Sequence, residues 1–166
     1  MPYSNTEIDE QATALLKAVF GSLDAVLFPI DLNQITQYCG LSVMQGTFKE
    51  PGLEGVLDRQ KQTIYLAENA ALPYQNFTAA HELGHFKLHA DKKVDTFSMH
   101  DLNSLMQRAA KGGEEAEADR FAASLLMPEK SFRAIWEATK DLEKISNIFG
   151  VPMVVVLYRL QSLHLY

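Results

Sequence analysis

The sequence predicts an α+β fold, and three observations lead to it. Three short runs of β-forming residues, separated by turn residues, lie in the first half of the chain and indicate a small antiparallel or mixed sheet of three strands. A segment with helical periodicity follows them directly and is predicted to be a central helix. The second half of the chain repeats apolar residues at helical spacing, so it is predicted to be helical.

Length and composition fit one globular domain. The 166 residues are 47% hydrophobic and 22% charged, and we expect a single domain over residues 1–166 with a helical C-terminal subdomain at about 129–166. The formal net charge is −6. This charge argues against direct binding of nucleic acid, because proteins that bind the phosphate backbone usually carry a basic excess or a basic face.

Cysteine usage and hydropathy indicate the cellular setting. Cys39 is the only cysteine, so no intramolecular disulfide can form. The N-terminus lacks a basic segment followed by an apolar run, and no stretch approaches the roughly 18 apolar residues of a membrane span. We therefore expect a cytoplasmic protein with no membrane partner. The sequence indicates no particular oligomeric state.

Two helices are predicted before the sheet. Residues 6–20 place apolar side chains on one stripe, with acidic residues in the first turn and Gly21 after the last turn. A short helix follows over residues 32–39, with Asp31 as its N-cap and Gly40 as its C-terminal stop.

The middle of the chain holds the strands and the central helix. The predicted strands cover residues 41–49, 55–58 and 61–67. The central helix is predicted over residues 74–90, with Pro73 near its first turn, where a missing backbone N–H is tolerated.

The remaining residues are predicted to be a loop followed by helices. Residues 91–113 are charged and are expected to form a mobile loop that includes a helix over residues 102–110. Further helices are predicted over residues 114–127, 130–139, 141–149 and from the turn at 150–152 to about residue 163.

The central helix contains the pattern His-Glu-x-x-His at His81, Glu82 and His85. Residues four apart on an α-helix lie on the same side, so both imidazoles can bind one zinc ion. Glu82 lies beside them, where it can take a proton from a water molecule bound to that zinc. A catalytic zinc site needs a third protein ligand from another element and leaves one position open.

The predicted helix over residues 114–127 offers that ligand. At 100° per residue, Glu115 and Asp119 fall on the same face as the apolar residues, whereas Glu117 lies nearly opposite and should be in water. A carboxylate on a buried face needs a cation or a hydrogen-bond partner. We therefore predict that Glu115 binds the metal and Asp119 orients a ligand histidine; an ion pair with an arginine such as Arg159 is the alternative.

A glycine in the central helix suggests how the two helices meet. Gly84 costs about 1 kcal/mol in a helix interior, so it is expected to have a packing role. Together with Ala118 and Ala122 on the other helix, it would let the two backbones approach closely.

The two motifs together resemble a known family. Residues 77–89 read Phe-Thr-Ala-Ala-His-Glu-Leu-Gly-His-Phe-Lys-Leu-His, and residues 115–128 read Glu-Ala-Glu-Ala-Asp-Arg-Phe-Ala-Ala-Ser-Leu-Leu-Met-Pro. This pair resembles the ImmA/IrrE family of zinc metallopeptidases, whose pattern is a histidine–glutamate helix ending in His, then Glu-x-x-Ala-(Asn/Asp)-x-Phe-Ala-x-x-Leu-Leu-Met-Pro. The resemblance extends through residues 28–32, 64–66 and 159–160, and so covers most of the chain.

The resemblance implies a zincin-like (gluzincin) core with one Zn²⁺ per chain and Glu115 as the third ligand. It also implies a cytoplasmic host and cleavage of a protein partner, often a transcriptional repressor of a mobile element or a stress regulon. This sequence departs from the family in two ways. Members often have an arginine just before the Phe-Thr of the active helix, where this chain has Tyr74-Gln75-Asn76, and many carry an N-terminal repressor-like DNA-binding domain, which this sequence lacks.

The expected reaction is hydrolysis of a peptide bond. Zinc lowers the pKa of its water and polarises the scissile carbonyl, while Glu82 accepts the water proton and passes it to the leaving amine. The candidates for oxyanion or substrate contacts are His89, His100, Tyr65 and Tyr158. For His89 the alternative is a packed or ligand-supporting histidine, and for His100 a solvent-exposed one. The edge of the strand at residues 62–67 could pair with an extended substrate.

Two other functions compete with this interpretation. The segment 141–160 resembles a helix-turn-helix, but its second helix contains one basic residue, Arg159, and almost no polar side chain that could reach a base edge. The other alternative is a zinc-containing module that binds a repressor without cutting it. The presence of Glu82 argues against that alternative.

Overall fold

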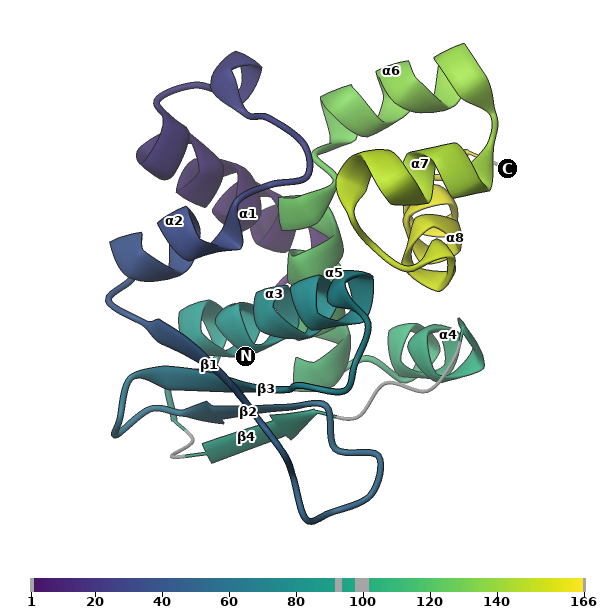
Figure 1. Cartoon of the computed structure of the whole chain (residues 1–166). Helices are drawn as coiled ribbons and strands as arrows, with labels where there is room; N and C mark the ends of the chain where they lie inside the picture. Colours follow the sequence, from purple (N-terminus) through teal and green to yellow (C-terminus); the bar gives the residue numbers. More distant parts are fainter. Residues whose placement is uncertain (1, 92–93, 98–101, 166) are drawn as a thin grey trace.

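A computed structural model describes residues 2–91, 94–97 and 102–165 of the chain. A twisted sheet forms one side of the molecule, helix α3 (Leu72–Leu88) lies across it, and the remaining helices pack on the far side of α3 (Figure 1). The predicted α+β class, with a small mixed sheet and a helical C-terminal half, is confirmed.

Within the described residues the sheet has four strands in the order β1-β3-β2-β4. The strands are β1 (Ser42–Gly46), β2 (Gly55–Asp58), β3 (Thr63–Ala67) and β4 (Val94–Phe97). β1 runs parallel to β3, and the other pairs are antiparallel, so the sheet is mixed. The first three strands were predicted, but β4 lies where a mobile loop was expected.

The strand order corrects one prediction about the substrate. β3 pairs with β1 on one side and with β2 on the other, so both of its edges are occupied. An extended peptide therefore has no free edge of β3 to pair with, and the prediction for residues 62–67 is wrong. Among the described strands, β1 and β4 have a free edge.

The N-terminal helices follow their sequence signals. Helix α1 (Asn5–Phe20) begins at a capping box in which Ser4 and Glu7 bond each other's backbone N–H, and Gly21 ends it at φ 87°. A short 3-10 turn, η1, covers Leu23–Ala25. Helix α2 (Leu32–Tyr38) is capped by Asp31, which accepts from the Asn33 N–H at 3.0 Å.

The helices of the second half match their predicted ranges to within three residues. They are α4 (Leu102–Lys111), α5 (Glu114–Leu126), α6 (Glu129–Thr139), α7 (Leu142–Phe149) and α8 (Met153–Ser162). The separate C-terminal subdomain at about 129–166 stays a prediction.

Helix α3 is the middle layer of the molecule. Every residue over 77–85 is buried, because the sheet covers one side of the helix and α5 covers the other. Both contacts require a glycine. A Cβ on Gly55 of β2 would lie 2.3 Å from Thr78 Cγ2, and a Cβ on Gly84 would lie 3.2 Å from the Ala118 backbone. The predicted packing role of Gly84 is confirmed.

The basic residue of the predicted helix-turn-helix is buried. Arg159, the basic residue of α8, is 2% exposed and donates to the Met127 carbonyl and to Ser124 Oγ, both at 3.1 Å. Burial lowers its pKa to about 10. It therefore cannot reach a phosphate, and the helix-turn-helix alternative loses its one basic contact.

No single helix among the described residues has the length and apolar composition needed to cross a membrane. The pair α7 and α8, bent by 100°, meets the criteria of length and composition together.

Replacing Gly84 by Ala is expected to destabilise the protein by about 1–3 kcal/mol, the usual range for overpacking. The added methyl would press on the Ala118 backbone, which cannot move without the whole of α5. Urea denaturation measures the effect. Gly46→Ala is the matched control, because a Cβ there meets nothing within 4 Å. Equal unfolding free energies for the two variants would contradict this account of the α3–α5 contact.

Candidate metal centre

Helices α3 and α5 bring together two imidazoles and a carboxylate. His81 Nε2 lies 3.1 Å from His85 Nε2, and the two Glu115 oxygens lie 3.2 Å and 3.1 Å from those nitrogens. Both histidines are buried, whereas the Glu115 side chain is 44% exposed. The predicted trio of His81, His85 and Glu115 thus converges on one point, which is reachable from solvent on the Glu115 side.

The spacing of these atoms fits a metal ion. Zinc binds histidine nitrogen and carboxylate oxygen at about 2.0–2.2 Å, so the ligands of a tetrahedral site are separated by about 3.3 Å. The separations of 3.1–3.2 Å observed between Nε2 and Oε atoms are close to this value. Two nitrogens and one carboxylate form a donor set that zinc accepts, and a fourth position remains for water or substrate.

The first candidate ligand, His81, is hydrogen-bonded to the carboxylate of Asp119. His81 Nδ1 lies 2.9 Å from Asp119 Oδ1, so its N–H donates to the carboxylate and Nε2 is left to face the cluster. Asp119 is fully buried, and its charge is balanced by Arg108 of α4, which bonds both oxygens at 2.6 Å and 3.2 Å. The alternative pair with Arg159 does not form; sequence reasoning missed Arg108.

The electrostatics of the trio are those of an ion pair when no metal is bound. Burial by itself would lower the pKa of His81, but hydrogen bonds to Asp119 and Glu115 outweigh it and raise that pKa to about 9. Burial would raise the pKa of Glu115, yet hydrogen bonds from His81 and His85 hold it well below its usual range. A bound cation would replace the proton that the imidazoles and the carboxylate share.

The second candidate ligand, His85, is hydrogen-bonded to another histidine. His85 Nδ1 lies 2.9 Å from His89 Nδ1, and His89 Nε2 lies 2.7 Å from Glu117 Oε2. The prediction that Glu117 should be in water is wrong, because the residue is 8% exposed. The N-terminal segment covers it, and the Tyr3 N–H donates to Glu117 Oε1 at 2.9 Å. His89 is therefore directed at His85 and Glu117.

Of the other oxyanion candidates, Tyr65 and Tyr158 are directed away from the cluster. Tyr65 lies on β3 between Ile64 and Leu66, which face α3, so the alternation of the strand directs Tyr65 to the opposite face. Tyr158 is buried on α8, and burial raises the pKa of its phenol. His100 lies outside the described residues.

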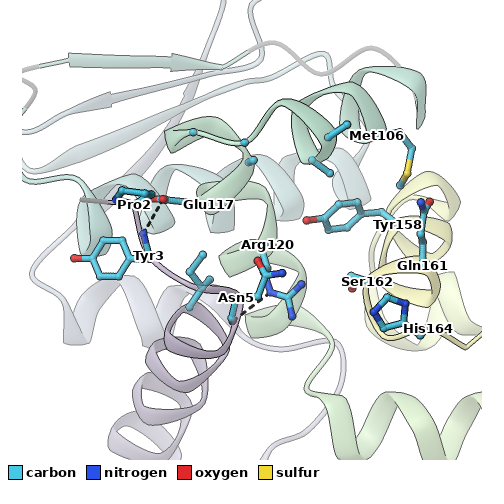
Figure 2. Close-up of a pocket in the computed structure, with 16 residues that line it drawn as sticks. Pro2, Tyr3, Asn5, Met106, Glu117, Arg120, Tyr158, Gln161, Ser162 and His164 are labelled. Atoms are coloured by element: carbon cyan, nitrogen blue, oxygen red, sulfur yellow. Dashed lines mark hydrogen bonds between the residues drawn. The ribbon is translucent and has the colours of Figure 1, made fainter.

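Tyr158 lines a separate cavity of about 660 Å³ enclosed by the N-terminal segment, α4, α5 and α8. Figure 2 shows this cavity, with Tyr3 and Glu117 joined on one side and Tyr158 on the other. The cavity lies on the face of α5 that includes Glu117 and Arg120, and residues two apart on a helix, such as Glu115 and Glu117, point about 200° apart.

Glu82 is fully buried and close to the sheet. A Cβ on Gly55 would lie 3.6 Å from Glu82 Cγ and Oε1, so the carboxylate lies against β2 and the absence of a side chain at Gly55 makes room for it. The Glu82 charge also helps to raise the pKa of His81, which places the two side chains near each other.

The C-terminal end of α3 is held by a residue that the motifs did not include. Arg59, in the turn between β2 and β3, donates to the carbonyl of His85 at 2.8 Å and to the carbonyl of His89. A cation at a helix C-terminus is favourable, and here it also fixes the backbone of both histidines.

Comparisons with known proteins identify the family of the chain. A model of a peptidase family, described as the IrrE N-terminal-like domain, matches residues 36–161. The chain is 27% identical over 154 residues to a protein named metallopeptidase ImmA from Bacillus subtilis (strain 168), covering 89% of this chain and 86% of that protein.

A solved structure named Mycobacterium tuberculosis transcriptional regulator has the same fold. It matches 94% of this chain with a TM-score of 0.67 at 16% sequence identity. The chain spans 46% of the length of that protein.

We expect purified protein to bind one zinc ion per chain, and Glu115→Ala to lower the affinity by more than about 100-fold, since loss of a group behind a ligand already costs 10–100-fold. Elemental analysis after dialysis against a chelator measures the bound metal. Glu10→Ala, on the exposed part of α1, is the control and should retain the ion. Unchanged zinc in Glu115→Ala would assign the third ligand to another carboxylate.

The metal-free protein should lose stability as the pH rises from about 6.5 to about 9. The pKa of His81 is about 9 in the folded chain and near 6.5 when unfolded, so its contribution is complete below the lower value and lost through the higher one. Urea denaturation at a series of pH values measures this. Stabilisation by added zinc should grow over the same interval, and a flat metal-free profile would contradict the prediction.

Proposed function

The chain belongs to the peptidase family described as the IrrE N-terminal-like domain, and on this premise we propose that it is a zinc-dependent endopeptidase that cleaves a cytoplasmic protein partner. The observation that supports the proposal most is the convergence of His81, His85 and Glu115 next to a buried Glu82. This arrangement combines three metal ligands with a carboxylate that can move a proton.

A bound divalent metal would supply Lewis-acid chemistry, polarising the scissile carbonyl and lowering the pKa of the attacking water. His81, His85 and Glu115 would hold it, and Asp119 keeps His81 in the correct orientation. Glu82 accepts the proton of the attacking water and transfers it to the leaving amine nitrogen. Its full burial keeps the carboxylate away from bulk water.

The substrate strand is assigned to the edge of β4. A peptide that adds to a sheet needs a strand with unpaired backbone groups, and β1 and β4 are the described strands with a free edge. Of these two, β4 packs against α3, the helix that contains His81 and His85. An extended peptide paired with Val94–Phe97 would therefore run beside the metal-binding helix.

We assign the substrate to the class of transcriptional repressors of mobile elements or stress regulons. The support is the likeness to a protein named metallopeptidase ImmA and to the motif pattern of its family. The buried position of Arg159 on α8 also favours action on a protein over action on DNA, since it leaves α8 without a basic contact.

Glu82→Gln tests the proposal. The amide cannot accept the water proton, so cleavage of a candidate repressor from the same genome should fall by about 10²–10⁴-fold. Mass spectrometry of the products gives the rate and the cleavage site. The variant should bind as much zinc as the unaltered chain, which separates loss of the base from loss of the metal.

The same pair of proteins tests the non-catalytic alternative. If wild type and Glu82→Gln relieve repression equally and no fragments form, the peptidase proposal fails and the chain acts by binding its partner. Glu10→Gln, on the exposed face of α1, provides a control for the loss of one negative charge.

A further inference from the structure

A line of hydrogen bonds connects the N-terminal segment to Nδ1 of His85, the ring nitrogen that faces away from His81 and Glu115. The Tyr3 N–H lies 2.9 Å from Glu117 Oε1, Glu117 Oε2 lies 2.7 Å from His89 Nε2, and His89 Nδ1 lies 2.9 Å from His85 Nδ1. Glu117 and His89 are 8% and 7% exposed, and His85 is fully buried. The line is therefore shielded from water over most of its length.

The chemistry of these side chains determines which atom donates and which accepts in each hydrogen bond of the line. An ionised carboxylate only accepts hydrogen bonds, so His89 must donate from Nε2 to Glu117. A neutral imidazole carries one N–H, and with that hydrogen on Nε2 the Nδ1 of His89 is an acceptor. His85 must then donate from its own Nδ1. Its Nε2 lies 3.1 Å from Glu115, and when a metal ion replaces the proton shared there, this nitrogen is left with a lone pair for the ion.

We propose that Glu117 and His89 are positioning residues for metal binding, because together they fix the tautomer of His85 in which Nε2 can bind the ion. The proposal rests on the metal site formed by His81, His85 and Glu115. In this site each ligand histidine is oriented by a carboxylate of α5: His81 directly by Asp119, and His85 by Glu117 through His89.

The spacing along both helices makes this arrangement possible. His85 and His89 are four residues apart at the end of α3, so their rings lie on one side of it, with centroids 5.0 Å apart. Glu115 and Glu117 are two residues apart on α5, so their side chains diverge by about 200°. Glu115 can therefore reach the ion, while Glu117 points away from the ion and contacts His89.

The N-terminal segment has a specific part in this line. Figure 2 shows Tyr3 and Glu117 in contact at the edge of the cavity beneath α5. The Tyr3 N–H can only donate, so the Glu117 atom that faces it has to be an acceptor. In the native protein both oxygens of the Glu117 carboxylate are acceptors. The Tyr3 N–H therefore does not change which atoms of His89 and His85 donate.

Glu117→Gln is predicted to exchange donor and acceptor in the two hydrogen bonds that join residue 117 to His89 and His89 to His85. The Tyr3 N–H would select the amide oxygen, which turns the amide NH₂ towards His89 Nε2. His89 would then accept at Nε2 and donate from Nδ1, and His85 would accept at Nδ1 and carry its hydrogen on Nε2. That hydrogen occupies the position of the metal, so a side chain of nearly the same shape should prevent binding.

Zinc affinity, measured by competition with a chromophoric chelator, tests the proposal. We expect the affinity of Glu117→Gln to fall by about 10–100-fold, the range for groups behind a ligand. Glu117→Ala should lose less than Glu117→Gln, because it removes the acceptor without imposing the wrong tautomer. A merely structural role predicts the opposite order, since Gln preserves the packing and Ala does not.

Nitrogen-15 NMR of the histidine rings in the metal-free protein gives a second readout. His89 should carry its hydrogen on Nε2 in wild type and on Nδ1 in Glu117→Gln. Glu10→Gln, which removes a carboxylate from the exposed face of α1, should match wild type in both measurements.

The outcomes separate this proposal from the metal site itself. Equal zinc affinity in Glu117→Gln and wild type, or a greater loss in Glu117→Ala, would overturn the role of Glu117. Absence of zinc binding by wild type would overturn the metal site, and the present proposal with it. Urea denaturation of the metal-free variants shows whether each is folded before its affinity is compared.

Discussion

The close contact between α3 and α5 is the constraint on which the rest of the site depends. Gly84 lets the Ala118 backbone approach to a distance at which a Cβ would lie only 3.2 Å away. Packed helices are normally separated by about 8–10 Å. Close approach lets short hydrogen bonds span from one helix to the other, and Glu115 and Asp119 both reach imidazoles of α3 at 2.9–3.2 Å. A bulkier residue at either position would move both carboxylates together.

That contact brings acidic and basic groups into a region with little water, so each of them needs a partner. Asp119 is balanced by Arg108 of α4, and Glu117 accepts from the Tyr3 N–H of the N-terminal segment. A buried polar group left without its partner costs about 1–3 kcal/mol, and more when it is charged. Two elements outside the α3–α5 pair are therefore needed to keep the histidines in one orientation, although neither supplies a metal ligand.

Much of the centre could be predicted from the sequence, because a helix converts spacing into direction. The i and i+4 spacing of His81 and His85 and the 100° rotation per residue of α5 were enough to select Glu115 and Asp119 from several carboxylates. The three strands over residues 41–67 could also be predicted from local information, in their case from the β-forming residues of each run. The family resemblance added the class of enzyme, which geometry alone does not provide.

The predictions that were wrong concern contacts between residues far apart in the sequence. Periodicity describes one helix and a single buried face, but Glu117 is covered by a segment 114 residues away in the sequence, which no local pattern reveals. The order of the sheet is also a non-local property, so the interior position of β3 and the existence of β4 could not be read from the runs that form them. The roles of Arg108 and Arg59 could not be predicted either, because only the fold brings each arginine next to the groups that it bonds.

The separation of imidazoles onto α3 and carboxylates onto α5 has an electrostatic reason. His85 lies in the last turn of α3 and His89 is its C-cap, where the helix dipole favours positive charge. Glu115 and Glu117 lie in the first turn of α5, where the dipole favours negative charge. The fold brings these two ends together, so helix ends of opposite partial charge face each other across the site. Ionised carboxylates are required both as ligands and to fix the direction of the hydrogen bonds behind the ligands. The same helix ends thus support the ion directly, through Glu115, and indirectly, through the tautomer of His85.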